Sequence, residues 1–509
     1  MYKYAFDWKK YAYSDSGAKF ATNQDIKSTF TKVNIAESKF SASGIPLLIE
    51  DGFVYVNSEM ENTLIFGETG SKKTRCLVKP LIALTGGAGN SAVITDVKGE
   101  LSSDPKLRSY LESKGIRCVS LDFRFCDKDS YNIFQYAINL YKNGHYDKAM
   151  ANITSIVHAL NEKYDHSTAD PYWQLMEEQH LLPILHMLLE ICEKNKEYEK
   201  YVNMLSVSSF ANEKGTELLE CMVENYYRHI SNNSIQMLKS VLSTPEKTKS
   251  SIISVTASVL RDFIMQESLT AMLSDTTFSI TDMYEKPTFV FLIIPDENST
   301  YDTIAGLLLD NFYSQLLEIF TEKYQNRMAP PCNISFICDE MCNVKINDMR
   351  AKISASRSRY IRWYLICQSL RQLEAAYENE ASTIVGNCKN IILLQSSDPS
   401  MLEYISNLCG NTNISLKEGG EPLLPPEKLK HLKKTREYKE AIYIRESLVY
   451  LSILPDYDQY AFLQPYTEFN KQKTKKKKKK VAIYTPEQML RDSESGKMDL
   501  PFKDKGVKV

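Results

Sequence analysis

The sequence predicts an α/β protein whose mainly parallel sheet is interrupted by an inserted all-helical domain. From about residue 61 to residue 122, short β-branched runs alternate with helical patterns, as in TLIFG, SAVITD and IRCVSLDF. Strand-like runs return in FVFLIIP, ISFICDE, WYLICQS and NIILLQS, each followed by a helical pattern. Buried strands that alternate with amphipathic helices are typical of βαβ units in one parallel sheet.

The region between the two sets of strands shows helical spacing only. Its apolar residues recur at helical intervals in DPYWQLMEEQHLLPILHMLLEICEK and KGTELLECMVENYYRHI. We therefore assign residues 61–149 and 246–465 to one α/β domain and residues 150–245 to an all-α insertion. Residues 1–60 are expected to form an N-terminal extension without transmembrane helices.

Composition places the chain among globular proteins and gives no global sign of nucleic-acid binding. Hydrophobic residues make up 43% and the formal net charge is only −2, so any DNA surface must be a local patch. The eleven cysteines lack paired CxxC spacing, which predicts reduced thiols rather than a zinc site. The longest apolar runs fall short of the roughly 20 residues that a spanning helix needs. We expect a cytoplasmic protein, with peripheral attachment at the inner face of the membrane as the alternative.

The segment TLIFGETGSKKTR has the strand, turn and helix start of a phosphate-binding loop. In such loops the backbone N–H groups and the helix N-terminus point at the phosphates. Lys73 would reach the β- and γ-phosphates of ATP, and Thr74 would ligate Mg²⁺. The predicted nucleotide-binding residues are Gly67, Glu68, Thr69, Gly70, Ser71, Lys72, Lys73 and Thr74. The alternative is a solvated turn that caps a helix.

One position departs from the phosphate-loop pattern GxxxxGK[ST]. Glycine is expected immediately before the lysine, and this chain has Lys72 there. If the backbone at that position needs a positive φ, a side chain costs on the order of 1 kcal/mol and can obstruct the phosphates. Nucleotide affinity therefore depends on how Lys72 is accommodated.

A pair of carboxylates ends the strand-like run ISFICDE. Asp339 is assigned to the Mg²⁺ shell and Glu340 to the general base that activates water. Taken alone, an Asp-Glu pair after a strand is equally compatible with a solvated turn. The phosphate loop elsewhere in the chain favours the catalytic interpretation.

Two further residues are candidates for the hydrolysis reaction. Gln368 ends WYLICQS and would sense the γ-phosphate or orient the attacking water, or is an ordinary polar residue at a strand end. Arg357 lies in ISASRSRYIRW and would act as an arginine finger across a subunit boundary. A solvated helix end or a contact to a DNA phosphate is the alternative for this arginine.

At these motifs the sequence resembles the type IV secretion coupling proteins, the TraG-like conjugative DNA-transfer ATPases. The resemblance spans residues 63–429 and is most specific in the run from CDEMCNVKINDMR to CQSLRQLEAAY and the following GNC. The other blocks that carry it are TLIFGETGSKKTR, VITDVKGEL, DPYWQLMEEQHLL and EPLLPPEKL. Asp96, Lys98 and Glu100 match a family segment near the nucleotide, and no chemical role is assigned to them.

The resemblance implies a RecA-like nucleotide-binding domain and a homo-hexameric ring that hydrolyses ATP with Mg²⁺ between subunits. The implied partners are DNA, expected to be single-stranded and bound without sequence preference, relaxase or relaxosome proteins, and the secretion channel. Family members usually begin with transmembrane helices. This chain shows none, so we expect it either to be recruited by a separate membrane partner or to act as a soluble relative.

Two other functions remain open. Lys72 would allow a non-hydrolysing receptor that recruits relaxase or effector proteins through the helical insertion. A motor of the related DNA-segregation type would share the RecA-like core, but it is not expected to carry the DPYWQLMEEQ insertion.

Residues 466–509 are predicted to be a disordered, lysine-rich tail, because eight lysines fall between Lys471 and Lys480 and like charges that dense repel one another. The tail would bind DNA phosphates or an anionic membrane surface, or would remain solvated without a partner.

Overall fold

The computed structural model describes residues 18–162, 171–225, 232–295, 300–325, 328–412, 421–466 and 480–497. The chain divides into two compact units. An α/β unit comprises residues 1–120, 280–302 and 316–473, and a helical unit comprises residues 121–279, 303–315 and 474–509.

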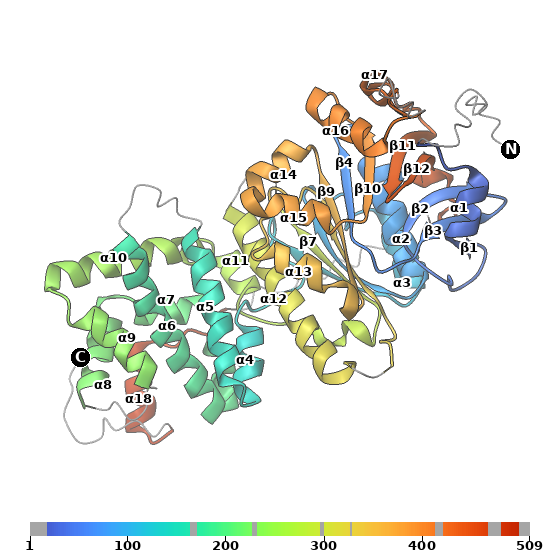
Figure 1. Cartoon of the computed structure of the whole chain (residues 1–509). Coiled ribbons are helices and arrows are strands. Elements are labelled where there is room, and N and C mark those ends of the chain that lie inside the picture. The colour runs from blue at the N-terminus through green and yellow to red at the C-terminus, as the bar shows by residue number, and fades with distance from the viewer. Residues whose placement is uncertain are drawn as a thin grey trace. The chain divides into compact units, whose positions relative to one another are not determined.

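The α/β unit is built on a nine-stranded sheet in the order β12-β11-β10-β4-β9-β8-β5-β7-β6 (Figure 1). The pairings β10 to β4, β4 to β9, β9 to β8, β8 to β5 and β5 to β7 are all parallel. The hairpin of β11 and β12 adds two antiparallel strands at one edge. The predicted α/β class with a mainly parallel sheet is confirmed. The strands are β4 (Thr63–Gly67), β5 (Ser91–Asp96), β6 (Arg117–Asp122), β7 (Thr288–Ile293), β8 (Ile334–Cys338), β9 (Ile361–Cys367), β10 (Asn390–Gln395), β11 (Tyr438–Arg445) and β12 (Leu448–Pro455).

Helices cover both faces of this sheet (Figure 1). The connections from β4 to β5 and from β5 to β6 run toward one edge, and those from β8 to β9 and from β9 to β10 run toward the other. Since crossovers between parallel strands are right-handed, the two groups of helices lie on opposite faces. One group is α2 (Lys79–Gly87) and α3 (Pro105–Ser113); the other is α13 (Met349–Ala355), α14 (Leu370–Tyr377) and α15 (Ala381–Gly386).

Shorter elements complete the α/β unit. They are η2 (Thr74–Val78), η5 (Thr281–Tyr284), η6 (Arg357–Arg359), η7 (Glu378–Glu380), α16 (Pro399–Cys409), α17 (Pro426–Lys430), η8 (Tyr457–Gln459) and η9 (Ala461–Leu463). Helix α12 (Thr300–Lys323) has residues in both units.

The predicted N-terminal extension folds as part of the α/β unit from residue 18 onward. It contains α1 (Asn23–Thr29) and an antiparallel sheet of β1 (Thr31–Asn34), β3 (Phe53–Asn57) and β2 (Ile45–Glu50). Ser452 on β12 donates to the carbonyl of Leu47 at 2.6 Å. Asn57 donates to the side chain of Asn390 on β10 at 2.9 Å. These buried contacts join the small sheet to the large one.

The helical unit contains no strand within its described residues other than the last two residues of β6. Its helices are α4 (Gln135–Lys142), α5 (Tyr146–Glu162), α6 (Pro171–Lys194), η3 (Lys196–Tyr201), α7 (Met204–Phe210), α8 (Glu213–Asn225), α9 (Asn232–Leu242), α10 (Glu246–Met265), α11 (Glu267–Met272) and α18 (Pro486–Glu494). In the part of the chain that the structure describes, no helix combines the length and the apolar character needed to cross a bilayer.

The helical unit is larger than the predicted insertion at residues 150–245. Residues 121–149 and 246–279 were assigned to the α/β domain, but they fold with the helices. Tyr131 N–H donates to the carbonyl of Met272 at 2.9 Å, and Asn132 donates to that of Val202 at 2.8 Å. Such long-range hydrogen bonds leave no signal in local periodicity, so the predicted boundaries are corrected here.

The prediction of a disordered tail is wrong for residues 480–497. Tyr484 and Met489 are fully buried, and α18 belongs to the helical unit. Tyr198 donates to Asp492 at 2.8 Å, and Asn203 donates to the carbonyl of Ala482 at 2.8 Å. The dense lysine run before this short amphipathic helix led to the prediction of disorder for the whole tail. Residues 467–479 and 498–509 lie outside the described residues.

A carboxyl group is buried in the centre of the helical unit. Glu177 on α6 is fully buried, and both of its carboxyl oxygens lie within 2.8 Å of the side-chain amide of Asn161. Burial, with a smaller effect from the neighbouring Glu178, raises the pKa of Glu177 to about 8. Burial therefore shifts the Glu177 carboxyl toward its protonated form.

We expect Glu177→Gln to flatten the pH dependence of stability. The folded state keeps a proton that the unfolded state releases above its ordinary pKa of 4.5, so wild-type stability falls as pH rises from there to about 8. Glutamine mimics the protonated carboxyl, so the variant should have the higher Tm at pH 9 and a similar Tm at pH 5. Thermal unfolding at both pH values tests this, with the exposed Glu217→Gln as control. Parallel pH profiles for wild type and variant would contradict it.

Candidate functional site

The predicted site residues gather at the carboxyl edge of three neighbouring strands. The phosphate loop leaves β4, Asp339 and Glu340 follow β8, and Gln368 follows β9. Because the order is β4-β9-β8 and the strands are parallel, these ends meet at one edge of the sheet. A crevice at the carboxyl ends of parallel strands is the usual ligand site of such sheets.

The lysine of the loop lies beside the predicted base. The Lys73 ammonium is buried, donates to the carbonyl of Gly67 at 2.5 Å and lies 3.6 Å from Glu340 Oε1. Gln368 Nε2 donates to Glu340 Oε2 at 3.0 Å. The two oxygens of Glu340 are thus held by two different predicted residues.

The loop has the shape of a cradle that side chains would fill. A Cβ at Gly67 would lie 2.7 Å from Ser71 Oγ and 3.0 Å from Lys73 Cγ, so a larger residue would displace these two side chains of the loop. Gly70 has a φ of +78°, which also favours glycine. Ser71 Oγ is buried and has no hydrogen-bond partner among the described residues. An orphaned hydroxyl inside a cradle of this type suits a bound anion.

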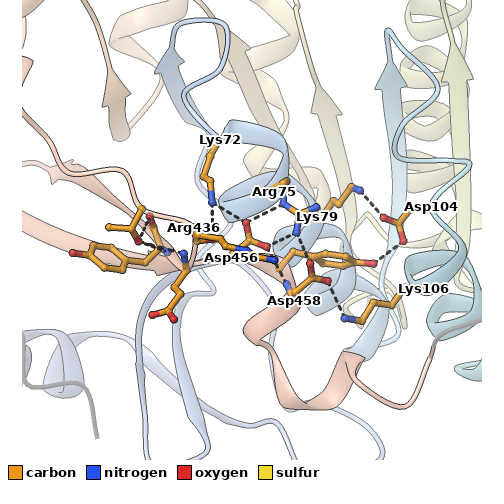
Figure 2. A network of polar contacts seen from close by, with 12 residues as sticks. Lys72, Arg75, Lys79, Asp104, Lys106, Arg436, Asp456 and Asp458 are labelled. Carbon is orange, nitrogen blue, oxygen red and sulfur yellow. Dashed lines mark hydrogen bonds and ion pairs between the residues drawn. The ribbon is translucent and has the colours of Figure 1, made fainter.

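The position that lacks the expected glycine does adopt the strained backbone. Lys72 has a φ of +64°. Its ammonium donates to the carbonyl of Arg436 at 2.8 Å and to Asp456 Oδ2 at 3.1 Å (Figure 2). The side chain is therefore fixed on a segment near the C-terminal hairpin.

The helix after the loop starts with an unusual turn. Residues Thr74–Val78 form a π-helical turn in which Lys79 N–H donates to the carbonyl of Thr74. Such turns are rare and occur often at functional sites. Thr74 sits at its first position, next to Lys73.

Burial and neighbouring charges both affect the pKa of Asp339. Burial and the adjacent Glu340 carboxylate raise the pKa of Asp339 to about 6, and Lys73 opposes this rise. Its Oδ1 is buried without a hydrogen-bond partner among the described residues, while its backbone carbonyl accepts from Thr95 Oγ1 at 2.7 Å. A carboxylate oxygen left unpaired beside the loop is a suitable ligand for a cation.

One predicted loop residue binds outside the loop, and another is exposed. Glu68 Oε1 accepts hydrogen bonds from the backbone N–H and, at 2.6 Å, the hydroxyl of Ser397, so its side chain ties the loop to the segment after β10. Thr69 is exposed.

The family segment at Asp96 has a structural explanation. Asp96 is buried and accepts from the backbone N–H groups of Leu101 at 3.2 Å and Ser102 at 2.8 Å. It therefore shapes the turn after β5, while Lys98 and Glu100 are exposed.

Arg357 is not brought to the other site residues. It is exposed on η6, which precedes β9 and so lies at the amino end of that strand, opposite the loop. Within one chain this arginine is far along the sheet from Lys73. The nearby Arg362 is buried and donates to Ser43 at 2.7 Å and Ser335 at 3.2 Å, which is a structural role.

Sequence reasoning missed two contacts to the loop. Lys434 donates to the carbonyl of Gly70 at 2.8 Å, and Asp456 binds Lys72. Both lie more than 360 positions from the loop in the chain, so no spacing pattern signals them.

Solved structures of a coupling protein share this fold. TrwB in complex with a non-hydrolysable ATP analogue matches with a TM-score of 0.60 and 15% identity over 91% of this chain and 97% of that chain. TrwBdeltaN70 in complex with sulphate matches with a TM-score of 0.59 and 15% identity, over 90% of this chain and 98% of that chain. TrwB in complex with ADP and Mg²⁺ matches with a TM-score of 0.57 and 15% identity, over 89% of this chain and 97% of that chain. At such identities the likeness shows the fold, which is the expected RecA-like one.

A search among curated proteins finds no match to the sequence. A family model described as type IV secretory system conjugative DNA transfer matches residues 18–445, a range that includes every predicted site residue but ends before Asp456. This match covers most of the chain, so the protein belongs to the conjugative DNA-transfer family of type IV secretory systems.

Proposed function

We propose that the chain is a coupling-protein ATPase that hydrolyses ATP to drive DNA, or a relaxase joined to DNA, into a type IV secretion channel. The observation that carries this proposal is the meeting of Lys73, Glu340 and Gln368 beside the cradle that begins at Gly67. The complexes of TrwB with an ATP analogue and with ADP and Mg²⁺ support the choice of ligand.

The residues of the loop fit a nucleotide with its metal ion. ATP supplies the phosphoryl group, and Mg²⁺ neutralises charge on the phosphates. Lys73 and backbone N–H groups of the loop would hold the triphosphate, with Ser71 Oγ as a further donor. The N–H groups of Glu68 and Ser71 donate instead to the carbonyls of Gln395 and Glu68. Thr74 and Asp339 would hold Mg²⁺, and the cation would offset the burial of the Asp339 carboxylate.

The hydrolytic step needs a base with a fixed orientation. Glu340 takes the proton of the attacking water, since its carboxylate ends β8 and faces Lys73. Gln368 holds the second oxygen of Glu340 and orients the water with it. The backbone of Glu340 has a φ of +53°, a strained conformation of the kind found at active sites.

Arg357 would complete the site of a neighbouring subunit. Arg357 is exposed at the amino end of β9, whereas the loop lies at the carboxyl ends of the strands, so it cannot contact the nucleotide of its own chain. In a homo-hexameric ring the same arginine would face the nucleotide of the next subunit and stabilise charge in the transition state. The helical unit would contact relaxase or DNA, and a separate membrane protein would anchor the ring at the inner face of the membrane.

A non-hydrolysing receptor is the second candidate, and the φ of +64° at Lys72 is the observation that favours it. The strain of a left-handed lysine would weaken nucleotide binding. ATP hydrolysis at background level in the wild type, together with capture of relaxase by the helical unit, would identify this function.

Glu340→Gln should abolish DNA-stimulated hydrolysis while ATP still binds. Loss of the general base is expected to lower kcat by about 100-fold or more. Phosphate release with and without single-stranded and double-stranded DNA measures kcat, and a fluorescent ATP analogue measures binding. The matched control is Glu374→Gln, an exposed carboxylate on α14. Unchanged turnover in the Glu340 variant would show that another group is the base.

The lysine run should strengthen DNA binding without sequence preference. Replacing Lys475–Lys479 by glutamine removes five charges and leaves the folded segment that starts at residue 480. The slope of log affinity against log salt should fall by up to about 0.7 per lysine on single-stranded DNA. Titrations of an oligonucleotide at several salt concentrations test this. An unchanged affinity at low salt would exclude the run from DNA binding.

A further inference from the structure

The segment that follows β12 lies directly beside the phosphate loop, as Figure 2 shows. Asp456 accepts from Lys72 at 3.1 Å and, with both of its oxygens, from Arg75 at 2.9 and 2.5 Å. Its side chain is only 5% exposed, whereas that of Asp458 is 54% exposed. One buried carboxylate therefore holds two cations of the loop and its first helical turn.

The other residues of this segment fasten it to helix α3. Tyr457 donates to Asp104 at 2.7 Å, and Lys79 donates to the other oxygen of Asp104 at 2.5 Å. Asp458 accepts from Lys106 at 3.1 Å (Figure 2). The position of Asp456 is thus fixed by contacts that do not involve Lys72.

The charge of Asp456 is well maintained. Burial opposes ionisation, but hydrogen bonds from Arg75 and Lys72 lower the pKa of Asp456 to about 2. An ionised, buried acceptor in a fixed place makes stronger hydrogen bonds than a neutral or exposed one.

Lys72 needs such an acceptor. A left-handed backbone is strained for a residue with a side chain, and Lys72 has a φ of +64°. The hydrogen bonds to Asp456 and to the carbonyl of Arg436 exist only when the ammonium reaches this segment. They therefore favour the strained φ and hold the long side chain on the segment.

We propose that Asp456 is a positioning residue that compensates for the glycine missing at Lys72, keeping the loop open to the phosphates of ATP. The proposal rests on the proposed function, because it concerns the same nucleotide site. Lys72 and Asp456 form a matched pair: the acid is needed because the lysine is present.

The charge of Asp456 by itself predicts that removing this residue strengthens ATP binding, the opposite of what a positioning role predicts. Asp456 is a negative charge near the triphosphate, so its removal alone should tighten the binding of an anion. If Asp456 acts by position, Asp456→Asn should weaken ATP binding despite this gain. The sign of the effect therefore separates the two explanations.

The test is a double-mutant cycle of wild type, Asp456→Asn, Lys72→Gly and the double variant. The readout is the Kd of a fluorescent ATP analogue with Mg²⁺. Asp456→Asn should raise Kd by about tenfold in the wild-type background and by less than about twofold when Lys72→Gly is also present. This difference corresponds to about 1 kcal/mol of coupling, since tenfold is about 1.4 kcal/mol.

Asp458→Asn is the matched control. It lies in the same segment and shares Arg75, and its asparagine variant can still accept from Lys106, but it has no hydrogen bond to Lys72 among the described contacts. Its Kd should stay the same or fall in both backgrounds. An equal loss of affinity from Asp456→Asn in both backgrounds, or no loss, would overturn the proposal, because Asp456 would then act through Arg75 or not at all.

A second readout separates this inference from the proposed function. If the wild type binds no ATP analogue, the proposed function fails, and the same four proteins are compared by thermal unfolding without nucleotide. Asp456→Asn should then lower Tm more when Lys72 is present than when it is replaced by glycine. Additive changes in Tm would overturn the pairing of Lys72 with Asp456.

Discussion

The position of the Lys73 ammonium is the constraint on which the site depends. It lies between a loop carbonyl and the Glu340 carboxylate, so it links the strand that carries the loop with the strand that carries the acids. Parallel strands alone bring these ends to one edge. The charged contact sets which oxygen of Glu340 faces the loop and leaves the other to Gln368.

The predicted phosphate loop of this protein has a left-handed lysine, Lys72, where glycine is expected. Most loops of this type solve the backbone problem with glycine, which has no side chain to clash. Here one glycine position is kept at Gly67, where a Cβ would have no room, and another carries Lys72, whose side chain leaves the cradle. The difference is physical: Gly67 faces the interior of the loop, whereas the side chain of Lys72 leads to the surface segment at Asp456.

Burial of carboxyl groups has different consequences in the two units. Asp339 keeps a buried, unpaired carboxylate oxygen beside the loop, the kind of atom that a cation could pair with. Glu177 is buried in the helical unit against an amide, and burial raises its pKa. The first arrangement suits ligand binding and the second suits packing, although both carboxyl groups lie in segments that resemble the family.

The sequence by itself determined the α/β class, and it predicted a phosphate loop and an acid pair at the ends of neighbouring strands, because strand patterns and loop chemistry are local. It also determined that Gln368 ends a strand of the same sheet. Only the tertiary structure decided the limits of the helical unit, the folding of residues 480–497 and the separation of Arg357 from the loop. Only the tertiary structure shows where the Lys72 side chain binds, because its partner Asp456 is 384 positions away. Long-range ion pairs leave no periodic signal in a sequence.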